Sequence, residues 1–405
     1  MKIVLILLTL GLMPMHSCTT SHKMADNQKP SGHYRLYTYP DKTPKKKFDS
    51  KRFKRVAFIS SNDFKGQVYP EITPINNRFK EQRLLKVGGV ANMKAYIDIF
   101  RDRYGDEMVY VDAGSFLDIK KNHAQTIFMY KYLGVDVASL GLNEFKIDTP
   151  SSLTHIDYLS SLTKDIPFDL VNANLFNLVK AQQVVLPGSK ETVIKEFNGL
   201  KIGFVGILTR DLAKKIPDKK INGLYIQNPL KNIVSQATKL RRNGANIIVM
   251  LANEGLDCTS RQAHSMNLSE DKVNFDPLDS GHCKTYESDF YELLKELPQG
   301  TVDLAITSGG NSKVANIVQD LPVVQNRGKG QFLSWVELYY DTKYQTIVPQ
   351  MTKLFQPVML CQNFLKNSQD CFKEGSIDNS ELIPAKFFGK EIKVQDLPRS
   401  IPRLE

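Results

Sequence analysis

The sequence predicts an α/β fold in which helices cover a sheet, because short apolar runs alternate with amphipathic stretches. Six runs have the length and composition of buried strands and end in small or polar residues: 55–61, 108–114, 136–141, 201–208, 246–252 and 302–308. In such a sheet, the polar residues just past the carboxyl ends of the strands form the ligand site. The 405 residues, of which 41% are hydrophobic, are enough for one large domain or two ordinary ones.

The stretch from Asn228 to Gly244 is the clearest predicted helix. Asn228 suits the N-cap, Pro229 suits the first helical position, and Gly244 lies just past the end. One face carries the apolar residues Leu230, Ile233, Val234, Ala237 and Leu240. We therefore expect an amphipathic helix that packs on the predicted sheet.

The N-terminus has the features of a secretory signal in residues 1–18. One lysine precedes an apolar run from Ile3 to Met13, which is too short to span a bilayer as a mature helix. The following Met-His-Ser-Cys resembles a bacterial lipobox, in which the cysteine, here Cys18, is acylated, although Met15 and His16 match it poorly. Lipidation of Cys18 and an ordinary cleaved signal both stay open. Either predicts export, and lipidation adds a membrane anchor in the periplasm, at the outer membrane or on the cell surface.

Residues 19–54 predict a disordered tether, because they are rich in Lys, Pro, Ser, Thr and Asn and lack a hydrophobic period. The stretch 42–55 carries eight basic residues and one acidic residue, so it supplies +7 of the net charge of +11. Beside a lipid anchor, such a segment holds anionic headgroups at roughly 1 kcal/mol per charge; a solvated linker explains it equally well. Nucleic-acid binding is not expected, because only Phe48 and Phe53 interrupt the charges and no binding module follows.

The remaining cysteines, Cys258, Cys283, Cys361 and Cys371, predict disulfides in an exported chain. Three connectivities are possible, and proximity favours Cys258 with Cys283 and Cys361 with Cys371. None of the four has the C-x-x-C spacing of a zinc or redox site. We therefore expect these cysteines to be structural.

The strand ends carry short motifs in a fixed order: SSNDFKG (60–66), VGGVANMKAYI (87–97), VDAGSFLD (111–118), SLGLNEFKID (139–148), LANEGLD (251–257) and TSGGNSK (307–313). The series resembles the 5'-nucleotidase family of calcineurin-like metallophosphoesterases, which carries T-N-D-x-H-G, G-G-x-A-R, D-A-G-D, G-N-H-E-F-D, S-H-x-G and G-H-T-H at these places. The resemblance is collinear over residues 55–341. It implies a metallophosphoesterase-like αββα sandwich, with two central sheets flanked by helices, in residues 55–345. The loop bounded by Cys258 and Cys283 resembles one of bacterial members, which supports that disulfide.

The resemblance implies two divalent metals held by seven side chains, among them a bridging carboxylate and several imidazoles. Carried over motif by motif, it keeps Asp63 as the first carboxylate. The other positions are replaced, with Lys65 at the first His, Ser115 at the bridging Asp, Leu142 at the Asn ligand, Asn253, Asn311 and Lys313 at the other His ligands, and Asn143 at the His that acts as acid or contacts phosphate. A protonated lysine is a poor ligand and repels a dication. We therefore expect no catalytic residue and no metal or other cofactor.

The seven histidines support this expectation: His16, His22, His33, His123, His155, His264 and His282 all lie outside the carried-over ligand positions. The last four fall at predicted helix starts or in loops, where we expect solvated side chains. The sequence also lacks a G-x-S-x-G turn, an H-E-x-x-H motif and a phosphate-binding loop. The family's nucleoside-binding domain would begin near residues 383–392, and we expect residues 346–405 to be a C-terminal extension without it.

Three interpretations stay open. The first is a non-catalytic exported lipoprotein that serves as a binding or structural module. Its former active site then holds a small anion through Lys65 and Lys313, with hydrogen bonds from Ser115, Asn143, Asn253 and Asn311. Alternatively the site is collapsed, with Asp63 paired to one lysine and Leu142 filling the space. The second is an active metal-dependent phosphoric ester hydrolase, in which Asp63 and the asparagines hold one Ca²⁺ or Mg²⁺. The third is a purely structural envelope or surface component, in which the fold is only a scaffold and the tether or a loop contacts another envelope protein.

Overall fold

The computed structural model of the chain describes residues 50–76, 79–120, 123–180, 182–209, 214–216, 223–258, 283–284, 288–310, 312–371 and 381–398. The chain divides into two compact units, residues 1–33 and 34–405, and every described residue belongs to the second. The predictions for the signal segment, Cys18, most of the tether, Asn311, His264 and His282 lie outside the described residues. Among the described residues, no helix is both long and apolar enough to cross a membrane.

The first of two large sheets has eight strands in the order β20-β19-β1-β4-β5-β6-β9, and β21 also pairs with β19. The strands are β1 (Phe53–Ser61), β4 (Met108–Asp112), β5 (Val137–Ser139), β6 (Asp169–Val171), β9 (Ser189–Lys190), β19 (Phe332–Asp341), β20 (Thr346–Ile347) and β21 (Lys353–Met359). The five strands from β1 to β9 in this order run parallel, whereas β19 pairs antiparallel with β1, β20 and β21.

The second sheet has six strands in the order β10-β11-β13-β16-β18-β17. These are β10 (Thr192–Phe197), β11 (Leu200–Ile207), β13 (Ile247–Ala252), β16 (Leu304–Thr307), β17 (Val314–Val318) and β18 (Leu321–Gln325). β11, β13, β16 and β18 run parallel. Every residue of β13 is buried, as expected for a parallel strand that is covered on both faces.

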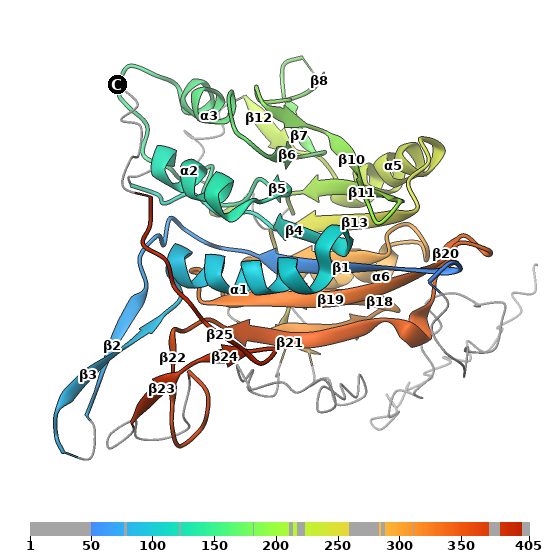
Figure 1. Cartoon of the computed structure of the whole chain (residues 1–405). Coiled ribbons are helices and arrows are strands. Elements are labelled where there is room, and N and C mark those ends of the chain that lie inside the picture. Colours follow the sequence, from blue (N-terminus) through green and yellow to red (C-terminus); the bar gives the residue numbers. More distant parts are fainter. Residues whose placement is uncertain are drawn as a thin grey trace, which may run out of the picture. The chain divides into compact units, whose positions relative to one another are not determined.

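Helices cover the outer face of each sheet (Figure 1). They are α1 (Gly89–Tyr104), α2 (His123–Leu133) and α3 (His155–Thr163) against the first sheet, and α5 (Pro229–Arg242) and α6 (Asp289–Glu296) against the second. One apolar core lies between the sheets, with Val56 and Phe58 of β1 opposite Phe204 of β11. Alternate residues of β1, Ala57 and Ile59, face the helices instead. The predicted αββα sandwich is therefore confirmed.

Smaller elements complete the fold. They are β2 (Glu71–Asn76) with β3 (Gln82–Val87), β7 (Leu175–Asn177) with β8 (Gln182–Gln183) and β12 (Leu224–Ile226), β14 (Asp257–Cys258) with β15 (Cys283–Lys284), β22 (Asn363–Leu365) with β23 (Leu382–Pro384), β24 (Lys386–Phe387) with β25 (Lys390–Glu391), and the 3₁₀ turns η1 (Gly105–Glu107) and η5 (Pro349–Met351). The β2–β3 hairpin extends away from the two large sheets (Figure 1).

The helix α5 begins as predicted, with the Asn228 side chain accepting a hydrogen bond from the Leu230 N–H at 2.9 Å. Its buried face differs from the predicted one, because Asn232 and Gln236 are buried while Val234 is only half-buried. The Asn232 amide donates to Gln227, and the Gln236 amide donates to Glu191 at 3.0 Å. These partners satisfy an N–H donor of each amide, whereas Gln236 Oε1 is buried without a hydrogen-bond partner among the described residues.

The domain limits differ from the predicted ones at both ends. β1 begins at Phe53, inside the predicted tether, and Arg52 forms an ion pair with Asp341 at 2.7 Å. The described part of the predicted C-terminal extension, residues 346–371 and 381–398, packs into the main core rather than forming a separate unit. β21 extends the first sheet, and Phe355 stacks on Trp335 with ring centroids 3.5 Å apart.

Cys361 and Cys371 form a disulfide, the pairing that their proximity favours. Both are buried in the core beneath α1, where Tyr96 donates a hydrogen bond to the Cys361 carbonyl. The backbones of Cys258 and Cys283 are paired in the β14–β15 ladder. The side chains of these two residues lie outside the described part of the structure, so this second disulfide stays a prediction.

We predict that replacing both Cys361 and Cys371 with alanine lowers the free energy of unfolding by about 3 kcal/mol, because the disulfide closes a short loop and restricts the unfolded chain. Urea unfolding of the variant and the parent without reductant measures this difference. Equal unfolding midpoints would show that the disulfide contributes nothing to stability.

Candidate functional site

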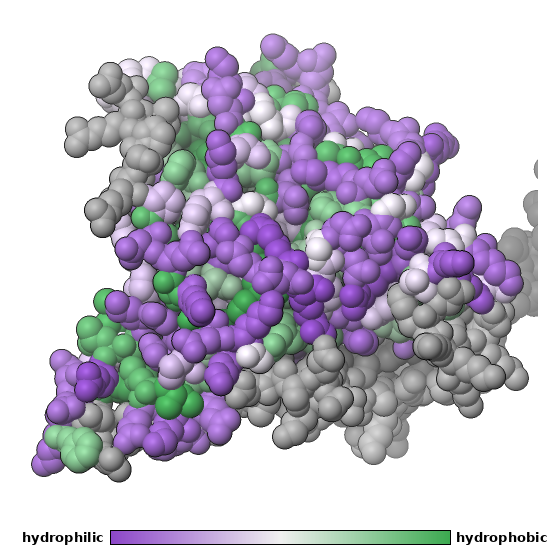
Figure 2. Space-filling model, viewed as in Figure 1, coloured by the Kyte–Doolittle hydropathy of each residue, from purple (hydrophilic) through white to green (hydrophobic). Residues whose placement is uncertain are grey.

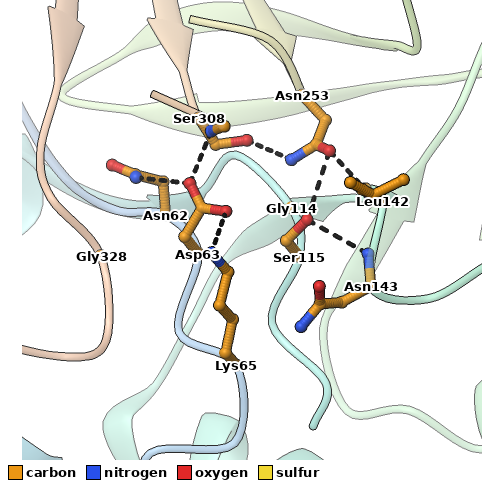
Figure 3. A network of polar contacts seen from close by, with 12 residues as sticks. Asn62, Asp63, Lys65, Gly114, Ser115, Leu142, Asn143, Asn253, Ser308 and Gly328 are labelled. Atoms are coloured by element: carbon orange, nitrogen blue, oxygen red, sulfur yellow. Dashed lines mark hydrogen bonds and ion pairs between the residues drawn. The ribbon is translucent and has the colours of Figure 1, made fainter. Parts of the chain in front are cut away.

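The candidate site lies where the carboxyl ends of the parallel strands of both sheets meet (Figure 3). The loops after β1, β4 and β5 come from the first sheet, and those after β13 and β16 come from the second. The first three carry Asp63, Ser115 and Asn143, and the fourth carries Asn253. Figure 3 shows these residues in one network of polar contacts, which Asn143 joins through its backbone N–H.

The carboxylate of Asp63 is buried, and both of its oxygens have partners. Oδ2 accepts hydrogen bonds from the Gly309 N–H at 2.6 Å and from the Asn62 amide at 3.1 Å. Oδ1 lies 3.3 Å from the Lys65 ammonium. Asp63 itself adopts a left-handed backbone (φ 48°), and its N–H donates to the Gly114 carbonyl at 3.0 Å. Asp63 is therefore fixed by both its backbone and its side chain.

Lys65 lies at the edge of the network. Its side chain is 44% exposed, and its backbone N–H donates to the Ser115 carbonyl at 3.1 Å. The ammonium thus reaches back from solvent to Asp63. An ion pair with one half-exposed partner is screened by water, so its contribution to stability is below about 1 kcal/mol.

Ser115 and Asn253 join the two sheets directly. The Ser115 hydroxyl donates to Asn253 Oδ1 at 3.2 Å and accepts from the Asn143 N–H at 3.3 Å. Asn253 Oδ1 also accepts from the Leu142 N–H at 2.6 Å, and its amide donates to the Ser308 hydroxyl. Each polar group of this pair is therefore used by a partner within the protein.

Glu144 is a site residue whose role was not predicted from the sequence. The glutamate of the family motif G-N-H-E-F-D is present at this position. Its carboxylate is fully buried and accepts hydrogen bonds from three backbone N–H groups, those of Ser115 at 3.0 Å, Leu117 at 2.9 Å and Gly141 at 2.7 Å. Burial raises the pKa of Glu144 to about 7, against the lowering effect of these hydrogen bonds.

Asp112, the last residue of β4, is the second buried carboxylate near the site. It accepts hydrogen bonds from the Ser61 hydroxyl at 2.7 Å, the Tyr130 hydroxyl at 2.9 Å and the Gly114 N–H at 2.8 Å. Burial raises the pKa of Asp112 to about 6, and the nearby charge of Asp63 adds to the increase. Asp112 thus holds the loop that contains Gly114 in place.

Lys313 does not join the Asp63–Lys65 pair through any described contact. Its side chain is buried, and the ammonium lies 5.7 Å from the centre of the Phe332 ring. Burial lowers the pKa of Lys313 to about 8; the positive charge of Arg327 lowers it further, while the negative charge of Asp370 opposes the shift. Asn311, its predicted neighbour at the site, lies outside the described residues.

The expectation that His123 and His155 are solvated is wrong, because both are buried at the first positions of α2 and α3. The ring of His123 hydrogen-bonds to Tyr158 and to the Asp118 carbonyl, both at 2.9 Å. The ring of His155 hydrogen-bonds to Thr149 and to the Glu144 carbonyl. Both histidines have structural partners on each ring nitrogen.

We predict that the free energy of unfolding falls as the pH rises from about 4.5 to about 7. Between these values the folded chain keeps protons on Asp112 and Glu144 that the unfolded chain has released, because the folded pKa values are about 6 and 7 against ordinary values of 3.8 and 4.5. The loss is at most about 3 kcal/mol for each carboxyl. Urea unfolding at a series of pH values measures it.

The control for this pH series is Asp112→Asn, which is expected to flatten the slope even though the variant itself is less stable. His123 opposes the carboxyls below about pH 6.5, because burial lowers its pKa; the parent-to-variant comparison therefore isolates the carboxyl. An unchanged slope in Asp112→Asn would contradict the assignment.

Comparison with known proteins places this geometry in context. No protein-family model matches the chain. The chain is 22% identical to Protein 5NUC of Lutzomyia longipalpis over 289 residues, and this alignment covers 70% of this chain and 46% of that protein. It is 26% identical to the cell wall protein Lmo0130 of Listeria monocytogenes over 138 residues, and this alignment covers 32% of this chain and 17% of that protein. The chain thus spans less than half the length of either relative.

Solved structures give the same likeness over about three quarters of the chain. They include a 5'-nucleotidase precursor from Thermus thermophilus (TM-score 0.52, 17% identity, 76% of this chain and 55% of that one). They also include the calcineurin-like phosphoesterase YfkN from Bacillus subtilis (TM-score 0.51, 16% identity, 76% and 90%) and the NAD nucleotidase NadN from Haemophilus influenzae (TM-score 0.51, 14% identity, 76% and 51%). The chain therefore has the fold of the calcineurin-like phosphoesterases and resembles the 5'-nucleotidases among them.

Proposed function

We propose that this chain is an exported, lipid-anchored protein that uses the calcineurin-like phosphoesterase fold as a non-catalytic binding or structural module of the cell envelope. One observation carries the proposal: the groups at the carboxyl edge of the two sheets are engaged with one another. Asp63 is held by Lys65 and Gly309, and Ser115 is held by Asn253. A site whose polar atoms are already paired has little capacity left for a ligand.

The residues present do not fit the pair of divalent cations that the fold implies. Such a pair needs several anionic or imidazole ligands, including one shared by both ions. Of the carried-over positions that are described, only Asp63 is a carboxylate, and the Lys65 ammonium lies 3.3 Å from it. Within the described ranges, no group of three or more His, Cys, Asp and Glu side chains lies close enough to hold a metal ion. A fixed positive charge at this distance disfavours a dication.

The contacts also favour a collapsed site over a small-anion site. The anion hypothesis needs Lys65 and Lys313 to act together, whereas Lys65 pairs with Asp63 and Lys313 lies against Phe332. The hydroxyl and amide that would complete an anion site, on Ser115 and Asn253, bond to each other. Leu142, which is half-buried, packs against the core beneath the first sheet.

Export is supported by three features. The N-terminal apolar run ends close to Cys18, the cysteines are even in number after it, and Cys361 and Cys371 form a disulfide. Disulfides persist in oxidising compartments outside the cytoplasm. Acylation at Cys18 would tie the fold to a membrane through the basic segment 42–55, with another envelope protein as the expected partner.

We predict that the soluble chain from Thr19 to Glu405 binds no stoichiometric metal and hydrolyses neither a phosphate ester nor a 5'-nucleotide above the background of Asp63→Ala. The physical reason is the paired state of Asp63 and the charge of Lys65. Metal content is measured after incubation with Mn²⁺, Zn²⁺, Mg²⁺ or Ca²⁺, and activity is assayed with each ion.

Asp63→Ala is also expected to be less stable than the parent by about 1 kcal/mol, since it removes the hydrogen bond between the exposed Gly309 N–H and the buried carboxylate. Lys65→Met, which keeps that acceptor, serves as the folded control. Metal-dependent turnover in the parent that disappears in Asp63→Ala would replace the proposal with an active phosphoesterase that has an altered metal site.

A separate prediction concerns the anchor. The full chain expressed in a bacterial host is expected to fractionate with membranes, and Cys18→Ser is expected to move most of it to the soluble exported fraction. Metabolic labelling with a radioactive fatty acid is expected in the parent only. Equal membrane association of both, with no labelled acyl group, would exclude the lipid anchor.

A further inference from the structure

The β2–β3 hairpin carries an apolar face that no described element covers. In its register, Pro74 is opposite Leu84 and Ile72 is opposite Lys86, so these four side chains share one face. Ile72 is 53% exposed and Leu84 is 50% exposed. Figure 2 shows hydrophobic surface over this part of the molecule. An antiparallel hairpin with one buried face normally turns polar residues outward, so this face is unusual.

Two residues of the opposite face, Ile75 and Leu85, are buried and hold the hairpin against its neighbours. Ile75 and Leu85 pack with Leu365 of β22, and Leu382 of β23 lies against them. The outward face is therefore held in place by the fold rather than exposed by a loose loop. Its side chains are available to a partner without rearrangement of the hairpin.

Charge at the hairpin selects the kind of partner. Its two glutamates are engaged, Glu81 with Arg83 at 3.3 Å and Glu71 with the Gln331 amide. Lys80 and Lys86 are exposed and form no ion pair with any described residue. Aliphatic side chains flanked by unpaired lysines match the boundary of an anionic bilayer, where apolar groups enter the acyl region and ammonium groups meet phosphate.

Pro74 argues against a partner that adds a strand to the hairpin. It removes a backbone N–H donor from the middle of β2, and proline is one of the devices by which edge strands avoid further pairing. The outward face is thus better suited to a disordered lipid surface than to a β-strand of another chain.

We propose that the outward face of the β2–β3 hairpin, formed by Ile72, Pro74, Leu84 and Lys86 with Lys80 beside it, binds the surface of an anionic phospholipid membrane. The proposal rests on the lipid-anchored part of the proposed function, because an anchored chain meets its membrane at high local concentration. A flexible chain as long as the 34 residues from Thr19 to Arg52 would have an end-to-end distance of about 30 Å. A weak contact is sufficient at this range.

The test uses the unlipidated chain from Thr19 to Glu405 and two kinds of vesicle, one of phosphatidylcholine alone and one of phosphatidylcholine mixed with phosphatidylglycerol. The parent is expected to co-sediment with the mixed vesicles. Ile72→Ser combined with Leu84→Ser is expected to weaken this binding about tenfold or more, since two half-exposed aliphatic side chains no longer enter the bilayer. Both residues are at the surface, so the variant is expected to fold.

The matched control is Leu178→Ser combined with Val179→Ser, which removes two exposed aliphatic side chains, 64% and 88% exposed, from another part of the surface. It is expected to bind like the parent. Lys80→Gln combined with Lys86→Gln is expected to weaken binding to the mixed vesicles while the basic segment 42–55 is unchanged.

Three results would overturn the proposal. They are no binding of the parent to either vesicle, equal binding of the parent and the Ile72/Leu84 variant, and a dimer of the parent that this variant dissociates without any effect of lipid. The last result would make the face an interface between two copies. Because the assay needs neither acylation nor catalysis, its failure is distinguishable from failure of the proposed function.

Discussion

The buried carboxylate of Glu144 is the constraint on which the geometry of the site depends. It gathers N–H groups from the loops after β4 and β5, and these loops carry Ser115, Leu142 and Asn143. A buried carboxyl is costly unless such donors surround it. The loops approach so closely that a Cβ on Gly141 would overlap the Ser115 nitrogen. Glu144 and Gly141 together therefore set the position of Ser115, whatever chemistry the site performs.

The second constraint is the junction between the two sheets at the same edge. Asp63 from the first sheet accepts a hydrogen bond from Gly309 in the second, and Asn253 from the second accepts one from Ser115 in the first. Each such bond contributes about 1 kcal/mol. The side chains of Asp63, Ser115 and Asn253 are buried, so removing the partner of one of them costs more than the hydrogen bond itself contributes. Side chains of the protein thus join the sheets where the resemblance places metal ions.

Features encoded locally could be predicted from the sequence. Continuous apolar runs identified the parallel strands, and Asn228 with Pro229 fixed the start of α5. The order of the strand-end motifs predicted the sandwich. It also predicted that Asp63, Ser115 and Asn253 lie at the same edge of the sheets. Features that depend on packing were missed: nothing local distinguishes His155, which is buried at a helix start, from a solvated histidine.

The pairing of Lys65 and the separate surroundings of Lys313 show the same limit. Both lysines stand at carried-over ligand positions, and the sequence left open whether they share an anion site or one of them pairs with Asp63. Lys65 follows Asp63 by two residues in a left-handed turn, which brings its ammonium back to the carboxylate. Lys313 lies just before β17, and its buried side chain meets Phe332 at the start of β19. Lys65 and Lys313 thus contact different partners. The turn geometry determines the position of the Lys65 side chain, and the packing of β19 determines that of Lys313.

The hairpin and the tether give the proposed membrane contact a direction. The chain enters the fold at Phe53, the amino end of β1, whereas β2 begins at Glu71, beyond the carboxyl end of that strand at Ser61. A strand of nine residues spans about 30 Å. Contact at the hairpin would therefore bring the carboxyl edge of the sheets, with the candidate site, beside the lipid surface. Membrane binding by the hairpin surface requires neither an open pocket nor bound cations at the candidate site.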